Sequence, residues 1–367
     1  MPKFVTTIFL AIISLSLFAQ SSTLPIEKLL AKKILQNVSY IPSKSFVSLS
    51  HTGSDSMSSY TSRIATNHSF YISKFEVTNK EYREFVLYVR DSMAHLLSKH
   101  FKNGFNLIDW SQPINWNDPL LEPIMLTPDE RINGKSEINA DKIMYELDFA
   151  GQKEMISIYP DTLVWMRDFT YSYNEPLSKK YFSNFSYDNY PVVGINLKQA
   201  MAFCQWKTDQ INELLEQARS EYKVIIRLPT NTEWEAAATD DNVKEKILSP
   251  DKVYKSNFGP VRDENGIRVK DFKDDGYFYT APVKSYSAGA YGLYNMKGNV
   301  AEWTSTSREE IMNAEVQPEK SKNSFVVKGG GWNSIPFYLQ TGVCQFFPIT
   351  AANSFTGFRY VAYIQKK

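Results

Sequence analysis

Three clusters of glycine, asparagine and tryptophan mark the last third of the chain. They read GLYNMKGNVAEW over residues 292–303, GGGW over 329–332 and GFR over 357–359. Short segments between Trp234 and Trp332 are repeatedly broken by Gly, Asn, Asp and Pro, the residues that favour turns. This punctuation interrupts helices and strands before they become long. The sequence therefore predicts a loop-rich domain with little regular structure in this region.

Helix signals are strong further upstream. Thr78 is a good N-cap residue, and Glu81 follows it by three positions, which together predict a helix from Asn79 through Leu97. Asn196 is placed to cap a second helix over 198–217. Alternating apolar residues predict two strands, Phe46 to Ser50 and His68 to Glu76.

Composition excludes some classes of partner. The 367 residues are 43% hydrophobic, which is enough for a sizeable core, and the net charge of +1 gives no bulk attraction to nucleic acid or an anionic membrane. Residues 1–20 carry Lys3, then an apolar stretch, then small residues, the pattern of a secretory signal peptide. We expect an N-terminal leader over 21–45 and one large domain over 46–367, in the periplasm or outside the cell.

The C-terminal clusters resemble the signature of the formylglycine-generating enzyme (sulfatase-modifying factor) family. The resemblance extends to EVTNKEY over 76–82 and RLPTNTEWE over 227–235, and it covers the chain from about residue 46 to the C-terminus. It implies an α+β, loop-rich fold of the formylglycine-generating-enzyme type, which is C-type-lectin-like with little regular secondary structure.

The same resemblance argues against the family's chemistry. The enzymes bind copper through two cysteines shortly after the GGxW element, because soft thiolates suit that metal. The corresponding positions here are Ser334 and Leu339, so we predict no copper and no enzyme activity. The two cysteines, Cys204 and Cys344, lack their family partners. They could pair with each other, but two buried free thiols are the favoured alternative.

Two groups of residues match the family's calcium ligands, which are hard oxygen donors. The first group is Asn295, Gly298, Val300 and Glu302; the second is Asn257, Phe258, Asp275 and Tyr277. Calcium in a structural role is therefore expected. The alternative is that Asn295 and Glu302 merely hydrogen-bond the loop backbone.

An aromatic-rich insert over about 90–189 carries a narrower resemblance. Its motifs YPDTLVW, YSYNEP and YDNYPVVGIN look like those of the GldK/PorK branch, whose members are non-catalytic components of the type IX secretion and gliding machinery. That resemblance implies a periplasmic ring or scaffold formed with a GldN/PorN-like partner, in which the chain is a homo-oligomer.

The chain lacks the lipid-modified cysteine that this branch normally carries after its signal peptide. We therefore expect it to contact the outer membrane only through partners. The other functions that this fold allows are a formylglycine-generating-enzyme-like oxidase and a ligand-binding module. The oxidase would require Cys344 to be exposed with a lowered pKa.

Overall fold

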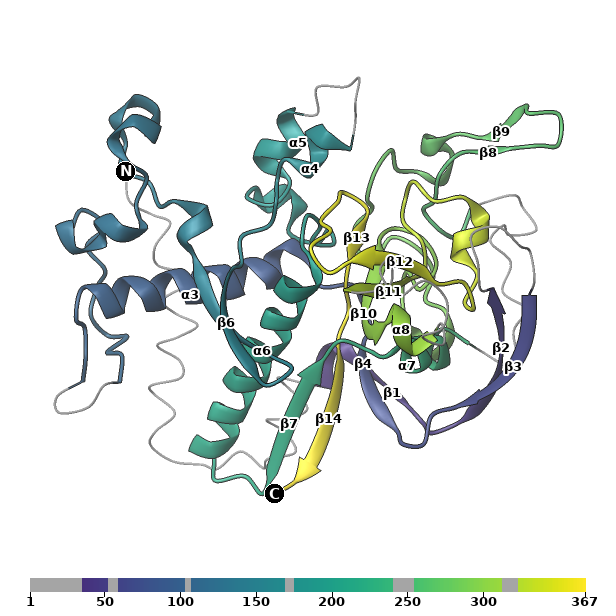
Figure 1. Cartoon of the computed structure of the whole chain (residues 1–367), viewed down its shortest axis with the longest axis horizontal. Helices are drawn as coiled ribbons and strands as arrows, with labels where there is room; N and C mark the ends of the chain where they lie inside the picture. Colours follow the sequence, from purple (N-terminus) through teal and green to yellow (C-terminus); the bar gives the residue numbers. More distant parts are fainter. Residues whose placement is uncertain (1–34, 52–58, 103–106, 169–174, 240–253, 312–322) are drawn as a thin grey trace.

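The computed structural model describes residues 35–51, 59–102, 107–168, 175–239, 254–311 and 323–367 (Figure 1). The predicted signal peptide over 1–20 and the start of the predicted leader lie outside the described residues. None of the helices in the described ranges is long and apolar enough to cross a membrane.

The first sheet is antiparallel, with the strand order β1-β4-β14-β7. Its strands are β1 (Val38–Ile41), β4 (Phe70–Ser73), β7 (Tyr222–Arg227) and β14 (Val361–Lys366). Strand β1 lies within the segment predicted to be a leader, but it pairs with β4 from Val38 to Ile41, and Ile41 is fully buried. The domain therefore begins before residue 46, because the sheet needs β1 to cover the edge of β4.

Two long helices confirm the capping signals. Helix α3 (Asn79–Leu97) begins where Thr78 accepts a hydrogen bond from the Glu81 N–H, and it has the predicted bounds. Helix α6 (Leu197–Gln217) starts at the Asn196 cap, one residue before the prediction. Figure 1 shows α6 beside β7, with α3 crossing behind it. Their buried faces meet at Tyr82 and Phe203, whose rings stack at 5.7 Å.

The second sheet has the order β12-β11-β10-β13 and lies against the loop region. Its strands are β10 (Ala301–Ser307), β11 (Ser324–Lys328), β12 (Gln345–Pro348) and β13 (Thr356–Gly357). Helices α7 (Asn231–Ala238) and α8 (Arg308–Ile311) adjoin it. From residue 254 to residue 300 the regular strands are only β8 (Val261–Arg262) and β9 (Arg268–Lys270), which confirms the loop-rich prediction there.

Two further hairpin and helix groups complete the fold. The hairpin of β2 (Ser45–His51) and β3 (Ser59–Ala65) confirms the first predicted strand. The insert contains the hairpin of β5 (Met144–Phe149) and β6 (Gln152–Ser157), and the short helices α4 (Val164–Arg167) and α5 (Glu175–Lys180). Leu147 and Ile158 reach the main core, so part of the insert is integral to the domain.

Candidate functional site

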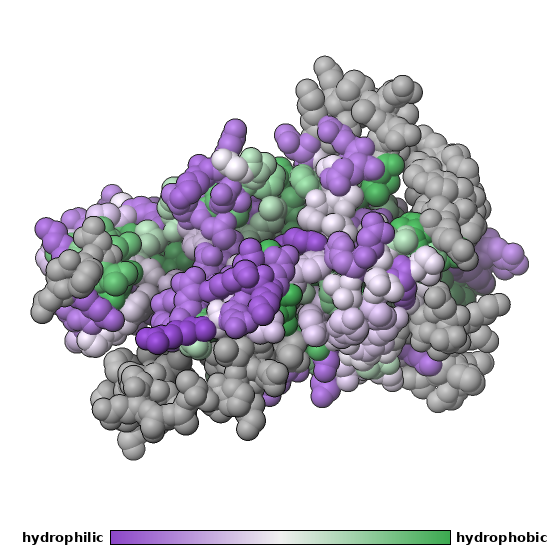
Figure 2. Space-filling model, turned by 90° about the horizontal axis from the view of Figure 1, so that it is seen from below, coloured by the Kyte–Doolittle hydropathy of each residue, from purple (hydrophilic) through white to green (hydrophobic). Residues whose placement is uncertain are grey.

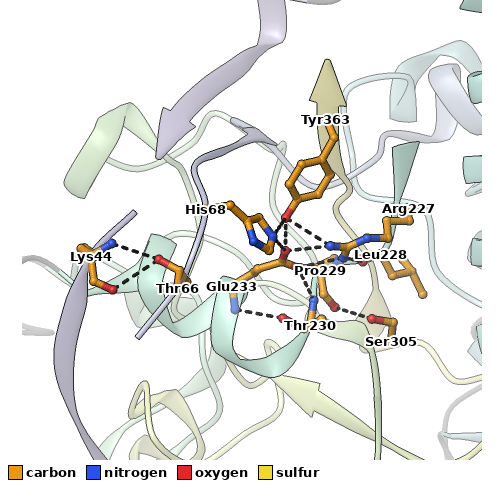
Figure 3. Close-up of polar contacts among 10 residues, drawn as sticks. All are labelled: Lys44, Thr66, His68, Arg227, Leu228, Pro229, Thr230, Glu233, Ser305 and Tyr363. Atoms are coloured by element: carbon orange, nitrogen blue, oxygen red, sulfur yellow. Dashed lines mark hydrogen bonds and ion pairs between the residues drawn. The ribbon is translucent and has the colours of Figure 1, made fainter. Parts of the chain in front are cut away.

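Helix α7 is fixed at its start by a network of charges (Figure 3). Thr230 and Glu233 form a capping box, in which each side chain accepts a hydrogen bond from the other residue's backbone N–H. Arg227 from β7 donates to both Glu233 oxygens, at 2.8 and 2.7 Å, and the Tyr363 hydroxyl from β14 donates to one of them. Burial alone would raise the pKa of Glu233, but the Arg227 guanidinium holds it at about 2. The helix is thereby attached to the first sheet.

The next two residues of α7 point to the second sheet. Trp234 donates its indole N–H to Glu302 Oε2 at 2.7 Å, and Glu235 accepts from the Lys328 ammonium at 2.8 Å. Both Glu235 and Lys328 are almost completely buried, at 1% and 0% side-chain exposure. These contacts place α7 between β10 and β11 on one side and β7 and β14 on the other.

One member of the first predicted calcium group, Glu302, forms a buried ion pair with Arg359. Glu302 accepts from Arg359 Nε at 2.6 Å and from Nη2 at 2.7 Å, in addition to the bond from Trp234. Arg359 also donates to the carbonyls of Ser73 and Tyr294. Glu302 thus bonds side chains rather than the loop backbone, contrary to the simple alternative for this residue. Through Arg359, the Glu302 carboxylate links β10 to the backbone of β4 at Ser73 and to the loop backbone at Tyr294.

A second carboxylate, Glu76, lies in the same cluster and was missed by the sequence reasoning. It accepts hydrogen bonds from Asn295 Nδ2 at 3.1 Å and from Asn299 Nδ2 at 2.8 Å. Burial raises the pKa of Glu76 to about 8, against the opposing Arg359 charge and with help from Glu302. Two carboxylates therefore face one guanidinium. With this pKa Glu76 is mostly protonated at pH 7, and a hard cation bound to its carboxyl group and to the Asn295 amide would favour the ionised form.

The loop backbone brings the two predicted calcium groups side by side. Gly298 has φ +85°, and a Cβ at this position would lie 2.1 Å from the Asn257 carbonyl oxygen, so only glycine fits. The Asn257 carbonyl accepts a hydrogen bond from the Asn299 N–H at 2.7 Å. The sequence assigned the two groups to separate sites and could not show that their backbones are in contact.

The second predicted calcium group already holds a cation of the protein itself. The Lys270 ammonium lies 2.6 Å from the Phe258 carbonyl oxygen and 2.7 Å from Asp275 Oδ2. The side-chain amide of Asn257 donates to the Tyr279 carbonyl. The Tyr277 N–H donates to Asp275 Oδ1 at 3.4 Å. With Lys270 in this position, these residues do not fit a calcium ion.

Ser334 and Leu339, the two residues that the sequence matched to the family's copper-binding cysteines, both lie beside Gly330. A Cβ built on Gly330 would be 3.2 Å from both Ser334 Cβ and Leu339 Cδ1. Ser334 Oγ accepts a hydrogen bond from the Gly331 N–H at 2.9 Å, and Leu339 is 1% exposed. These two positions therefore hold a hydroxyl engaged with the backbone and a buried apolar side chain.

Both cysteines are free. Burial raises the pKa of Cys204 well above its usual range. Burial also raises the pKa of Cys344, although Lys328 opposes this at 3.5 Å from Sγ. The Lys328 charge is shared with Glu235, which limits its effect on the thiol. Neither sulfur has the lowered pKa of a reactive thiolate.

A cleft of about 620 Å³ opens beside Glu76. Charged residues and two aromatic rings line it, among them Lys80, Lys207, Phe75 and Tyr360.

Glu76 lies in the EVTN motif that carries part of the family resemblance, and this motif was a sequence signal that Glu76 belongs to the site. No pattern in the sequence marked Lys270 or Lys328, because each is an isolated lysine whose partner is set by the tertiary path of the chain. Among the described residues, no three His, Cys, Asp or Glu side chains are grouped to hold a metal.

Residues 44–364 match the profile of the sulfatase-modifying factor enzyme 1-like domain, and the chain belongs to this family. The formylglycine-generating enzyme of Thermomonospora curvata is 32% identical over 120 residues, which cover 31% of this chain and 33% of that enzyme. The inactive C-alpha-formylglycine-generating enzyme 2 of Bos taurus is 29% identical over 147 residues, which cover 39% and 38%.

The chain therefore spans less than half the length of these curated relatives. Among solved structures, PvdO from Pseudomonas aeruginosa is similar with 15% identity and a TM-score of 0.44, over 89% of this chain and 93% of that one. The family match together with the mixed helices, sheets and loops confirms the predicted α+β fold of the formylglycine-generating-enzyme type.

Proposed function

We propose that the protein is a non-catalytic structural component of a periplasmic type IX secretion or gliding assembly. One observation supports the non-catalytic part: Ser334 and Leu339, which match the two thiol positions of the family by sequence, are both buried and carry no thiol. Copper binding and thiol exchange both require thiolates there. The raised pKa values of Cys204 and Cys344 argue against a relocated thiol chemistry. A relative named as an inactive enzyme supports the idea that this fold persists without that activity.

The insert over 90–189 supports the assembly part of the proposal. Some of its aromatic residues are core, since Trp165 is 1% exposed and packs on Tyr181 at 4.7 Å. Others present apolar surface: Phe185 is 80% exposed, Ile132 74% and Leu163 61%. Exposed apolar side chains mark protein interaction sites where they gather in a patch. The proposed contact is with a GldN/PorN-like partner and with neighbouring copies in a ring.

The surface around Leu163 is shaped to receive such an anchor. A hollow of about 340 Å³ there is lined by Tyr159, Leu163, Met166 and polar residues of α5 and its surroundings. Figure 2 shows the molecule from below, a different face on which hydrophobic residues are scattered among hydrophilic ones. In this proposal the protein is periplasmic and reaches the outer membrane only through its partners.

We also propose structural calcium, without copper, at the cluster of Asn295, Gly298, Val300 and Glu302. The support is a second buried carboxyl group beside the Glu302–Arg359 pair: burial raises the pKa of Glu76 to about 8, and a bound cation would stabilise its charged form. Two residues of the chain orient the carboxyl groups: Arg359 donates to Glu302, and Asn299 donates to Glu76. The metal would neutralise the remaining carboxylate.

The deciding experiment measures assembly size. The protein is co-expressed with a GldN/PorN-like protein, and complexes are sized by chromatography with light scattering. We expect a ring-sized complex, and at least tenfold weaker association for Leu163→Ser and Phe185→Ser. Tyr171 and Tyr173, also attractive because of the insert motifs, lie outside the described residues.

Matched controls are Ile267→Ser and Ile335→Ser, since these residues are 62% and 51% exposed but lie outside the insert. They should assemble as the wild type does. A wild type that remains monomeric beside the partner would refute the proposed function. Equal effects of the insert and control variants would refute the role of the insert.

A ligand-binding module is the second candidate, and the 620 Å³ cleft favours it. Lys207 pairs with Glu81 at 2.6 Å on its wall and lies over the Tyr360 ring at 5.2 Å, so the cleft offers charged groups to a polar ligand. A polar small molecule that raises the melting temperature of the wild type, and not of Lys207→Met, would support this candidate.

A further inference from the structure

Lys270 is the last residue of β9, in the β8–β9 hairpin that projects at the upper right of Figure 1. The side chain is 0% exposed. Its ammonium donates to the Phe258 carbonyl at 2.6 Å and to the Asp271 carbonyl at 3.0 Å, and it lies 2.7 Å from Asp275 Oδ2. An ammonium has three N–H donors, and here three oxygens receive them.

The surroundings keep water away from this ion pair. The Phe258 ring centroid is 4.4 Å from Nζ, and the Tyr254 ring is 5.4 Å away. The Asp275 carboxylate also accepts hydrogen bonds from the backbone N–H groups of Phe258 and Tyr277. A buried charge is tolerated only when it is paired and fully hydrogen-bonded, and this lysine meets both conditions.

The oxygens around the ammonium are ones that the family resemblance assigns to a calcium ion. Calcium sits about 2.3–2.6 Å from its oxygen ligands. The ammonium nitrogen is already at 2.6 and 2.7 Å from the Phe258 carbonyl and Asp275. A divalent ion bound to the same two oxygens would therefore overlap the lysine, and the two cations would repel each other.

We propose that Lys270 takes the place of a metal ion and acts as a cation built into this loop region. The exchange suits the local charge, because one ammonium neutralises the one carboxylate of Asp275, whereas calcium would leave an excess positive charge. It also removes the need for metal: the Phe258 loop and the turn at Asp275 are held together by a covalently attached charge. The hairpin carrying Lys270 is fixed to the loop by the same contacts.

The test is whether removing the Lys270 ammonium allows calcium to bind to the same oxygens. Lys270→Ala removes the ammonium and leaves the oxygens of Phe258, Asp271 and Asp275 in place. Calcium binding is measured by equilibrium dialysis, and melting temperature is measured in chelator and in excess calcium, with the wild type in parallel. We expect the variant to bind one more equivalent than the wild type. Its melting temperature should rise by roughly 5–10 °C at a hundredfold excess over the dissociation constant.

Two further variants make the result specific. Lys270→Ala/Asp275→Asn should lose the additional equivalent, because the only carboxylate among the described ligands is gone. Lys270→Gln leaves space and an additional amide oxygen, and it serves as the second test should the alanine variant fold poorly. The wild-type baseline separates this site from any ion bound near Glu302.

The proposal is overturned if neither Lys270→Ala nor Lys270→Gln binds more calcium than the wild type. It is also overturned if the wild type binds calcium that Asp275→Asn abolishes, because the metal would then coexist with the lysine.

Discussion

The ion pair between Glu235 and Lys328 allows a quantitative test of how the core is held together. Lys328→Met removes the ammonium but keeps most of the side-chain volume. Glu235 is then left 1% exposed with no counter-charge, and its Oε2 atom already lacks a hydrogen-bond partner among the described residues. Removing one member of a buried ion pair typically costs about 3–5 kcal/mol. For a domain of this size we expect the melting temperature to fall by roughly 10 °C.

The informative comparison is a double-mutant cycle. Glu235→Leu should also destabilise, because it leaves Lys328 buried without its carboxylate. The combined variant Glu235→Leu/Lys328→Met removes both charges and should lie within about 1–2 kcal/mol of the wild type, since apolar replacement of a whole buried pair is often neutral. Lys328 also lies 5.6 Å from the Trp234 ring, so a small packing loss is included in this range.

Urea unfolding followed by tryptophan fluorescence at pH 7 gives the four free energies of unfolding. A strong favourable coupling in the double variant supports the reasoning. Single variants that each cost less than about 1 kcal/mol, or a double variant equal to the sum of the singles, would show that these charges do not depend on each other.

Two other outcomes are expected. The pKa of Glu233 is about 2 in the folded protein and near 4.5 when unfolded, so its stabilisation of up to about 3 kcal/mol is present above pH 4.5 and is lost as the pH falls toward 2; Glu233→Gln should flatten that part of the stability–pH curve, and an unchanged slope would contradict the pairing with Arg227. A peptide with the Cys-x-Pro-x-Arg motif should not be converted to formylglycine, with or without copper, because Ser334 and Leu339 offer no thiol; product above a no-protein control, measured by mass spectrometry, would contradict this.

Local signals in the sequence were sufficient for the long helices. Helix α3 has the predicted bounds because Thr78 and Glu81 act within one turn of the chain. The strand predicted over 68–76 is shorter, at Phe70–Ser73, because only that stretch pairs with β1. The strands β10 and β11, which pair with each other, were hidden in a region read as loops because Gly, Asn, Asp and Pro punctuate it repeatedly.

The candidate site was also predicted from the sequence only where its residues lie close together along the chain. The sequence grouped Asn295 with Glu302, and the structure places both in one cluster around Arg359 and Glu76. It could not find Glu76, which is 219 positions from Asn295, because such a contact depends on the whole path of the chain. It also could not find that Lys270 lies on two of the oxygens predicted to bind calcium, since the spacing of the oxygens is the same with either cation.

Helix α7 has a consequence for how the protein unfolds. Its consecutive residues Glu233, Trp234 and Glu235 bond to the first sheet, to β10 and to β11 in turn. Arg359 makes a parallel link from Glu302 to the Ser73 carbonyl. Neither sheet can therefore separate while the other stays intact without exposing several buried charges at once. We expect the two sheets to form a single cooperative unit in hydrogen exchange, so that amides of β10 and β14 open with the same free energy.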